Sequence, residues 1–440
     1  MKRFILLLIS ALLLFTTACS SSIPPVEIPT DDAYHPETDN PYYMNQRAAQ
    51  CSVAQTENGY YFLLNSMLLY MDEDSQEPIP VCDKPNCLHH ESTTATAVAE
   101  CNAFFELNNA SSVFYYAGEV YVFHKRFQSG SSFSLKDADR YQLTLISADG
   151  SRRQTVWDLN LTGKSPMIAI IHRGYFYLVT QYANEQGKSV AQLWAYSLHE
   201  PGQEPQLLYE SDERDFTHNI VNCMYAYGNL FYLEEFLNSA TSSERIKSLR
   251  ILNLTTNEWT IPASPEGYIL MGSAISDGKL VRTYQPGGVT NALTPEGEKP
   301  DWTSPMLISD LDGSNAEEIA FDSWGRTAAD DTFIYVRDPM FFDERAFKTS
   351  VMTDYLNIYD VQMNLIDRLP LETLTYNEQL AILTIWPTNG EKILLQAWQI
   401  GGRHAIYYIN RSEIGSGNIT PKEILIYDPA IYSLANRGLY

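Results

Sequence analysis

The residues of this chain best suited to chemistry are cysteines and histidines gathered in one short stretch. The set comprises Cys82, Cys87, His89, His90 and Cys101, which span twenty residues. Three thiolates and one imidazole satisfy the tetrahedral coordination that Zn²⁺ prefers. The three cysteines with either histidine are therefore candidate ligands of a structural zinc ion. No other cofactor is expected.

Disulfide bonds are the interpretation that we favour for the same cysteines. Cys51 lies upstream, and with Cys82, Cys87 and Cys101 it makes four thiols, which allow three pairings. Paired cysteines outside the cytoplasm are usually disulfides, and unpaired thiols are the third possibility. A cross-link of either kind would pin a loop of about 25 residues. We expect Cys223, which lies in an apolar run, to be a small buried hydrophobe.

The first residues have the pattern of an export signal. Lys2 and Arg3 precede an apolar run from Phe4 to Phe15, and Cys19 follows shortly afterwards. Twelve apolar residues span about 18 Å as a helix, which is short of the roughly 30 Å hydrocarbon core of a bilayer. The run therefore predicts a cleaved signal peptide over residues 1–18 and no membrane span.

The small residue before Cys19 resembles the end of the lipobox of bacterial lipoproteins. The resemblance implies that Cys19 is lipidated and holds the chain at the extracytoplasmic face of the cell membrane, with this lipid as its only membrane contact. Thr16 stands where those proteins usually have Leu, and ordinary secretion is the alternative. Residues 19–50 contain five prolines and predict an extended, flexible tether. The alternative is an arm packed on the body around Tyr42 and Tyr43.

From residue 51 onward the chain repeats a β-rich run, a turn and a second β-rich run. The turns are marked by Gly59, Gly118, Gly174, Gly228, Gly278, Asp331 and Gly390. Their spacing of 50 to 59 residues is typical of propellers. A second hairpin follows, often at an Asp-Gly pair that favours a type I′ turn. Four antiparallel strands in seven copies predict an all-β, single seven-bladed β-propeller over residues 51–440. A pair of β-sandwiches would not explain a marker turn that recurs throughout.

The strand, Asp-Gly-Ser, strand unit is similar to the repeat of TolB-like and YWTD-type propellers. The segment Cys82-Asp83-Lys84-Pro85-Asn86-Cys87-Leu88-His89 and the later Cys101-Asn102 resemble a pattern found in Gram-positive bacterial surface lipoproteins. Those proteins have propeller-like bodies and no assigned function. The resemblance thus implies a fold and a location, and it implies no activity.

Charge and motifs exclude several classes of function. The formal net charge is −24, and no run of Lys or Arg follows the first three residues. Such a surface repels phosphate, so nucleic acid and anionic lipid are poor partners. The sequence has no nucleophile elbow, zinc-protease helix, Walker loop or dinucleotide-binding glycine motif. We expect a monomer.

Long connections between the second and third strands of successive repeats are the remaining signal. Ordinary hairpin loops take 2 to 5 residues, so length that recurs at one position suggests a use. These loops carry the aromatic residues Phe127, Tyr182, Trp302, Phe341 and Phe342. We favour a non-catalytic module that binds carbohydrate, peptide or protein through this face. The alternative is an extracellular propeller enzyme, a glycoside hydrolase or lyase, acting on polysaccharide.

Overall fold

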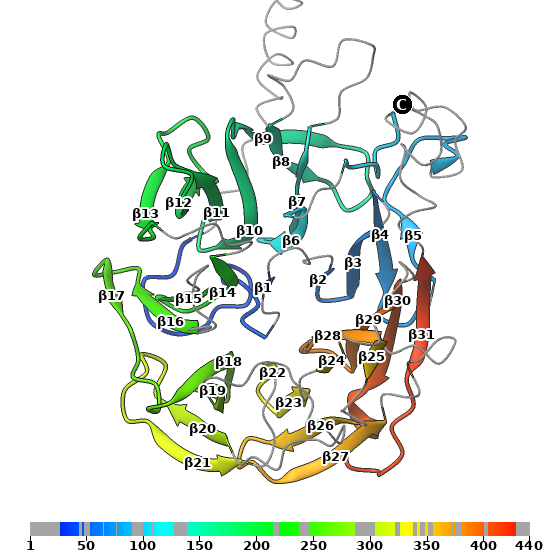
Figure 1. Cartoon of the computed structure of the whole chain (residues 1–440). Coiled ribbons are helices and arrows are strands. Elements are labelled where there is room, and N and C mark those ends of the chain that lie inside the picture. The colour runs from blue at the N-terminus through cyan, green and yellow to red at the C-terminus, as the bar shows by residue number, and fades with distance from the viewer. Residues whose placement is uncertain are drawn as a thin grey trace, which may run out of the picture.

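The chain folds into seven antiparallel sheets arranged around a central axis, so the predicted seven-bladed β-propeller is confirmed (Figure 1). The structure is a computed structural model. It describes residues 27–43, 46–47, 53–64, 66–75, 77–89, 100–106, 110–126, 139–213, 220–236, 247–286, 304–321, 326–337, 341–343, 348–350, 355–370, 374, 381–399 and 404–427. The predicted signal peptide and Cys19 lie outside these ranges. In the described part, no helix is long and apolar enough to cross a bilayer.

Blades 1 to 4 follow one another along the chain, each with its strands in sequence order. Blade 1 contains β2 (Val53–Gln55), β3 (Gly59–Leu64), β4 (Met67–Asp72) and β5 (Ile79–Pro80). Blade 2 contains β6 (Ser112–Tyr116), β7 (Glu119–Lys125), β8 (Arg140–Ile146) and β9 (Arg153–Asn160). Blade 3 contains β10 (Lys164–His172), β11 (Tyr175–Ala183), β12 (Ser189–Ser197) and β13 (Gln206–Glu210). Blade 4 contains β14 (Val221–Tyr227), β15 (Leu230–Phe236), β16 (Lys247–Asn253) and β17 (Glu258–Thr260).

Blades 5 to 7 complete the ring. Blade 5 contains β18 (Tyr268–Ser276), β19 (Lys279–Pro286), β20 (Ser304–Ser309) and β21 (Glu317–Phe321). Blade 6 contains β22 (Arg326–Ala329), β23 (Phe333–Arg337), β26 (Tyr355–Asp360) and β27 (Leu365–Pro370), and the hairpin of β24 (Phe341–Asp343) and β25 (Lys348–Ser350) is inserted between its second and third strands. Blade 7 contains β28 (Ala381–Trp386), β29 (Lys392–Gln399), β30 (His404–Asn410) and β31 (Lys422–Tyr427), with a 3₁₀ turn (Arg411–Glu413) after β30.

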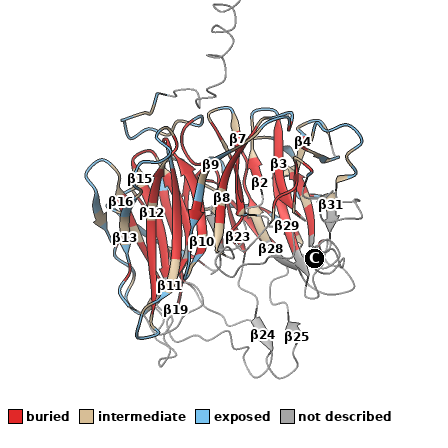
Figure 2. Cartoon of the chain, turned by 90° about the horizontal axis from the view of Figure 1, so that it is seen from above, coloured by how far each residue is buried: buried red, intermediate tan, exposed pale blue. Residues whose placement is uncertain are grey.

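Each sheet buries both of its faces against the neighbouring blades, which explains the continuous apolar runs in the second strands. In β7, Val122 packs with residues of blade 1, whereas the adjacent Phe123 packs with residues of blade 3. Successive side chains of a strand point to opposite faces of the sheet. Buried residues are accordingly concentrated in the strands, and exposed ones lie on turns and outer strands (Figure 2).

The marker turns are tight hairpins that join the first and second strands of the blades. In blades 2, 3 and 5 both residues of the turn have positive φ, as a type I′ turn requires. These pairs are Ala117-Gly118, Arg173-Gly174 and Asp277-Gly278. Because strands alternate in direction, all such turns lie at one end of the propeller, here called the turn face. The connections between second and third strands lie at the opposite end, here called the loop face.

Residues 27–43 form an arm that packs on the turn face. Tyr42 and Tyr43 are 2% and 6% exposed, and they join a hydrophobic cluster with residues of blades 1, 4, 5 and 7. Tyr34 and Tyr42 pack against Tyr227, which ends β14. Shortly after the arm, β1 (Gln46–Arg47) pairs with β14, the first strand of blade 4. The extended tether predicted for residues 19–50 is therefore shorter than expected, because the aromatic residues at its end are buried in the body.

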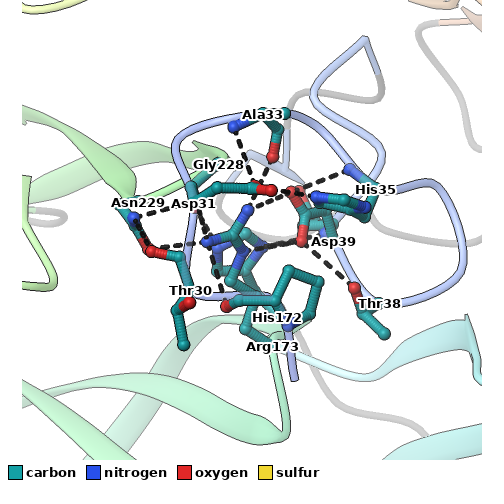
Figure 3. A network of polar contacts seen from close by, with 12 residues as sticks. Thr30, Asp31, Ala33, His35, Thr38, Asp39, His172, Arg173, Gly228 and Asn229 are labelled. Carbon is teal, nitrogen blue, oxygen red and sulfur yellow. Dashed lines mark hydrogen bonds and ion pairs between the residues drawn. The ribbon is translucent and has the colours of Figure 1, made fainter. Parts of the chain in front are cut away.

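A buried polar network fixes this arm (Figure 3). The Arg173 guanidinium donates to the Asp39 carboxylate at 2.8 Å and to the backbone carbonyls of Asp31 at 2.7 Å and Ala33 at 2.6 Å. The side chains of Arg173 and Asp39 are 5% and 0% exposed. Arg173 has a φ of 45°, which a residue with a Cβ seldom adopts. The contacts with the arm explain why arginine occupies this turn position.

His172 belongs to the same network and makes stability depend on pH. Its Nδ1 accepts from the backbone N–H of Asn40 at 3.0 Å, so Nε2 carries the proton donated to the Gly228 carbonyl at 2.9 Å. Complete burial is the main cause that lowers the pKa of His172 to about 4, while Asp39 opposes this shift and Arg173 adds to it. The folded protein therefore keeps this imidazole neutral in a pH range where the unfolded chain, with a pKa of about 6.5, takes up a proton.

We expect the burial of His172 to lower the free energy of unfolding by roughly 3 kcal/mol as the pH drops from about 6.5 to about 4. His124, whose pKa burial lowers to about 3, adds a loss of the same sign. Urea unfolding at a series of pH values measures the effect. His172→Gln should flatten the profile in that window, and an unchanged slope would contradict the role of His172.

Candidate functional site

Three of the predicted cysteines and one of the two histidines come together in space. One ligand atom from each of Cys82, Cys87, His89 and Cys101 lies within 4.8 Å of all the others. The three cysteines are free thiols, so no disulfide links them to one another in the part of the chain that the structure describes. Cys51 and His90 lie outside the described residues. Within the described residues, His89 supplies the imidazole of this cluster.

Local backbone turns bring these side chains together. Cys82 lies two residues after the end of β5, and the N–H of Cys87 donates to the Lys84 carbonyl at 3.3 Å, which closes a turn between the first two cysteines. His89 has a φ of 48°, and its Nδ1 lies 3.5 Å from the Cys101 sulfur. Cys101 is 1% exposed beside Phe104 in a small apolar cluster.

The segment that carries Cys101 is attached to blades 1 and 2. The N–H of Leu68 donates to the Ala103 carbonyl and that of Phe105 to the Ser66 carbonyl, both at 2.8 Å, which ties the segment to the β3–β4 turn of blade 1. The Asn102 side chain donates to the Gly150 carbonyl at 2.7 Å in the β8–β9 turn of blade 2. The cluster therefore lies at the junction of two blades and positions the loop between them.

The thiols lie in an environment that does not favour three negative charges. Burial raises the pKa of Cys101 to about 12. Burial also opposes ionisation of Cys82, but the backbone N–H groups of Lys84 and Asn102 and the thiols of Cys101 and Cys87 hold its pKa below the usual value. The Arg153 guanidinium donates to the Cys101 carbonyl at 3.4 Å and stacks on the Phe105 ring. A divalent cation would stabilise all three thiolates, because coordination deprotonates thiols outright.

The donor set fits zinc in type and nearly in spacing. With bonds of about 2.3 Å, sulfur ligands at the corners of a tetrahedron lie about 3.8 Å apart. The largest separation between ligand atoms in the cluster is within 4.8 Å, so each atom needs to move by less than about 1 Å. The arrangement can therefore hold a metal ion as a structural cross-link, with no open position for a reacting group.

The aromatic residues predicted for the ligand-binding face are described only in part. Tyr182 lies at the loop-face end of β11, half-buried, with the Lys164 ammonium 5.6 Å from its ring centroid. Burial, followed by the nearby carboxylates of Glu210 and Glu213, raises its pKa. Phe341 and Phe342 belong to β24, but their side chains are not described, and Phe127 and Trp302 lie outside the described residues. A ligand-binding role for these residues stays a prediction.

The arm network of Asp39, His172 and Arg173 was not found from the sequence. Its only signal was the pair Arg173-Gly174, where an arginine takes a turn position that usually favours Asn, Asp or Gly. Asp39 lies 134 positions away along the chain, and nothing in the sequence joins the two.

Comparison with known proteins does not assign the chain to a family. No protein-family model matches the chain, and no curated protein is significantly similar to it. A puromycin hydrolase S511A mutant complexed with PGG is 11% identical, with a TM-score of 0.49 over 88% of this chain and 55% of that one. An oligogalacturonate lyase in complex with manganese is 8% identical, with a TM-score of 0.46 over 80% of this chain and 84% of that one.

The β-propeller domain of the Trilobed protease from Pyrococcus furiosus is 8% identical, with a TM-score of 0.42 over 86% of this chain and 98% of that one. The chain spans about half the length of the puromycin hydrolase. At this level of identity and with TM-scores below 0.5, these similarities say nothing about the activity of this chain.

Proposed function

We propose that this chain is a surface lipoprotein whose propeller is a non-catalytic binding module. The observation that supports the proposal is that the buried carboxylates are bound by structural partners. In the described residues these are Asp39, Glu234, Glu235, Asp330 and Asp367. An enzyme that cleaves polysaccharide needs two carboxyl groups whose environments free them for acid and base roles. Each of these five has instead a structural partner.

Four of the five carboxylates are paired with a cation. Glu234 contacts the Lys247 ammonium, and Glu235 lies 2.7 Å from the Arg250 guanidinium. Asp330 is 3.0 Å from Arg411, and Asp39 is 2.8 Å from Arg173.

The fifth, Asp367, accepts from the backbone N–H groups of Gly415 at 2.9 Å and Gly417 at 3.1 Å. These partners occupy the lone pairs of the carboxylate oxygens. The buried acids thus brace the fold, which supports a binding function over the enzymatic alternative.

Within this function, the cluster of Cys82, Cys87, His89 and Cys101 serves as a structural zinc centre. It fixes the loop between blades 1 and 2, because zinc with four protein ligands contributes to folding and keeps no position for substrate. The support is the donor set and its spacing.

A substitution at Cys19 tests the proposed location at the membrane. The lipobox resemblance implies that the lipid is attached to this cysteine. Wild-type chain expressed in a bacterial host should sediment with membranes, whereas Cys19→Ala should appear in the soluble extracytoplasmic fraction. Cys223→Ala, which removes a buried thiol elsewhere, is the control and should stay with the membranes. Equal membrane association of wild type and Cys19→Ala would contradict the anchor.

The same soluble Cys19→Ala chain tests the binding role. We expect it to be retained on an array of bacterial and plant polysaccharides, peptidoglycan fragments and peptides without changing them. Reducing-end and unsaturated-sugar assays on every retained ligand measure turnover. Release of product from any of these ligands would replace the binding function by the enzymatic alternative.

A further inference from the structure

The contacts of the arm are confined to one face of the propeller. Its polar and aromatic partners in blades 2, 3, 4 and 6 are residues of first-to-second strand turns or of the strand ends beside them. In blade 2 the Ala117 N–H donates to the Glu37 carbonyl, and in blade 3 the Arg173 N–H donates to the Thr38 carbonyl. In blade 6 the Tyr42 hydroxyl donates to Asp331. The arm therefore crosses the turn face and is held there by several blades at once.

The arm packs so closely on the turns of blades 3 and 4 that their glycines have no room for a side chain. A Cβ added at Gly228, in the blade 4 turn, would lie 2.1 Å from the Asp32 carbonyl oxygen. A Cβ added at Gly174, in the blade 3 turn, would lie 2.6 Å from the Ile28 side chain. The Asn229 amide donates to the Asp31 carbonyl at 2.9 Å and to the Asp32 carboxylate at 2.9 Å.

The arm begins only a few residues after the lipid attachment point. Ile28 is nine residues after Cys19, and a fully extended chain covers at most about 3.3 to 3.6 Å per residue. The start of the seated arm thus lies within about 30 Å of the anchored end. Second strands of eight or nine residues, such as β19 and β11, separate the turn face from the loop face by roughly 30 Å. A tether of this reach would have to be fully extended along the side of the propeller to place the loop face at the bilayer, whereas it can place the turn face there without being extended.

We propose that the arm fixes the orientation of the propeller, with the turn face toward the membrane and the loop face directed away from it. This inference rests on the lipid anchor proposed above. Because the arm is bound to the turn face and its start lies close to the lipid, the turn face stays near the bilayer. Ligands therefore have access to the loop face and not to the turn face. The ligand of the loop face is therefore a molecule that arrives from outside the cell.

Energy transfer to the bilayer tests the orientation. The lipidated full-length chain is reconstituted on vesicles of neutral phosphatidylcholine that contain an acceptor-labelled lipid. A fluorescent non-natural amino acid replaces either Lys279, exposed at the turn-face end of β19, or Glu185, exposed in the loop after β11. Transfer should be more efficient from position 279 than from position 185. Equal transfer, or more from position 185, would overturn the orientation.

Variants of two glycines connect that result to the arm. Gly228→Ala forces a clash with Asp32 and should remove the difference between the two probe positions. Gly278→Ala has a similar positive φ, 66° against 55°, but its Cβ meets nothing within 4 Å. It is the matched control and should keep the difference. Asn229→Ala removes arm contacts without a clash and should also reduce the difference, which covers the case that Gly228→Ala does not fold.

Flotation of the vesicles separates the two proposals. A wild-type chain that does not float with vesicles overturns the anchor, and the orientation with it. A chain that floats with them, but shows equal transfer from both positions, overturns the orientation alone. A difference that survives in both Gly228→Ala and Asn229→Ala would show that the arm does not set the orientation.

Discussion

Asp39→Ala is expected to lower the free energy of unfolding by about 3 to 5 kcal/mol, because it leaves the Arg173 guanidinium buried without its counter-charge. The ion pair is 2.8 Å long, and its two side chains are 5% and 0% exposed. Solvent cannot compensate for the lost carboxylate at such a site. Urea unfolding of wild type and variant at neutral pH measures the difference.

The control for this prediction is on the same arm. Asp31→Ala removes a carboxylate that is 62% exposed and bonded to His35, and it keeps the backbone carbonyl that Arg173 uses. Its cost should stay below about 1 kcal/mol, as for other exposed ion pairs. The double variant Asp39→Ala with Arg173→Met should lose less than the sum of the single changes, because the two groups share one interaction. Equal costs for Asp39→Ala and Asp31→Ala would show that the arm does not brace the propeller.

The fold could be predicted because its signals are local. The blades are marked in the sequence by short turns between β-rich runs. The turn at Asp277-Gly278 has positive φ at both residues, which few residue types other than Gly, Asn and Asp tolerate. The apolar run Val120-Tyr121-Val122-Phe123 already indicates a strand buried on both faces. These signals depend on neighbours in the sequence, so their order along the chain gives the order of the blades.

The packed arm was only an alternative to a tether, and its polar network could not be predicted because its interactions join distant residues. Prolines and acidic residues before residue 42 are typical of a solvated tether, and no local pattern shows that Asp39 meets Arg173. The cysteine cluster is an intermediate case. Residue types and spacing predicted a cross-link by disulfide or metal, and they left His89 and His90 equivalent. In the described residues, the Nδ1 of His89 lies 3.5 Å from the Cys101 sulfur. The aromatic loop residues had no such geometric restraint, and their role still rests on loop length.

The centre formed by Cys82, Cys87, His89 and Cys101 gives the second large effect. We expect one zinc ion per chain by metal analysis, and loss of that ion on prolonged treatment with a strong chelator. Structural zinc contributes apparent binding energies of about 10 to 16 kcal/mol in small zinc domains at neutral pH. Here the blades have cores of their own, so the loss should be local. Residues 81–89 and 100–106 should lose protection from amide exchange and become open to proteolysis, while blades 3 to 6 stay protected.

Single substitutions separate the zinc centre from the disulfide alternative. Cys82→Ser and Cys101→Ser should each reduce the zinc content and open the same loop. Cys223→Ala removes a buried thiol outside the cluster and should leave one zinc per chain. Non-reducing mass spectrometry tests the disulfide alternative, because each disulfide lowers the mass of the chain by two hydrogens. A metal-free chain with a disulfide at two of the three cysteines would replace zinc by a covalent link. Metal-free, folded protein whose three thiols are all alkylated would exclude both cross-links, since the loop would then be ordered by its backbone contacts with Leu68, Ser66 and Gly150 alone.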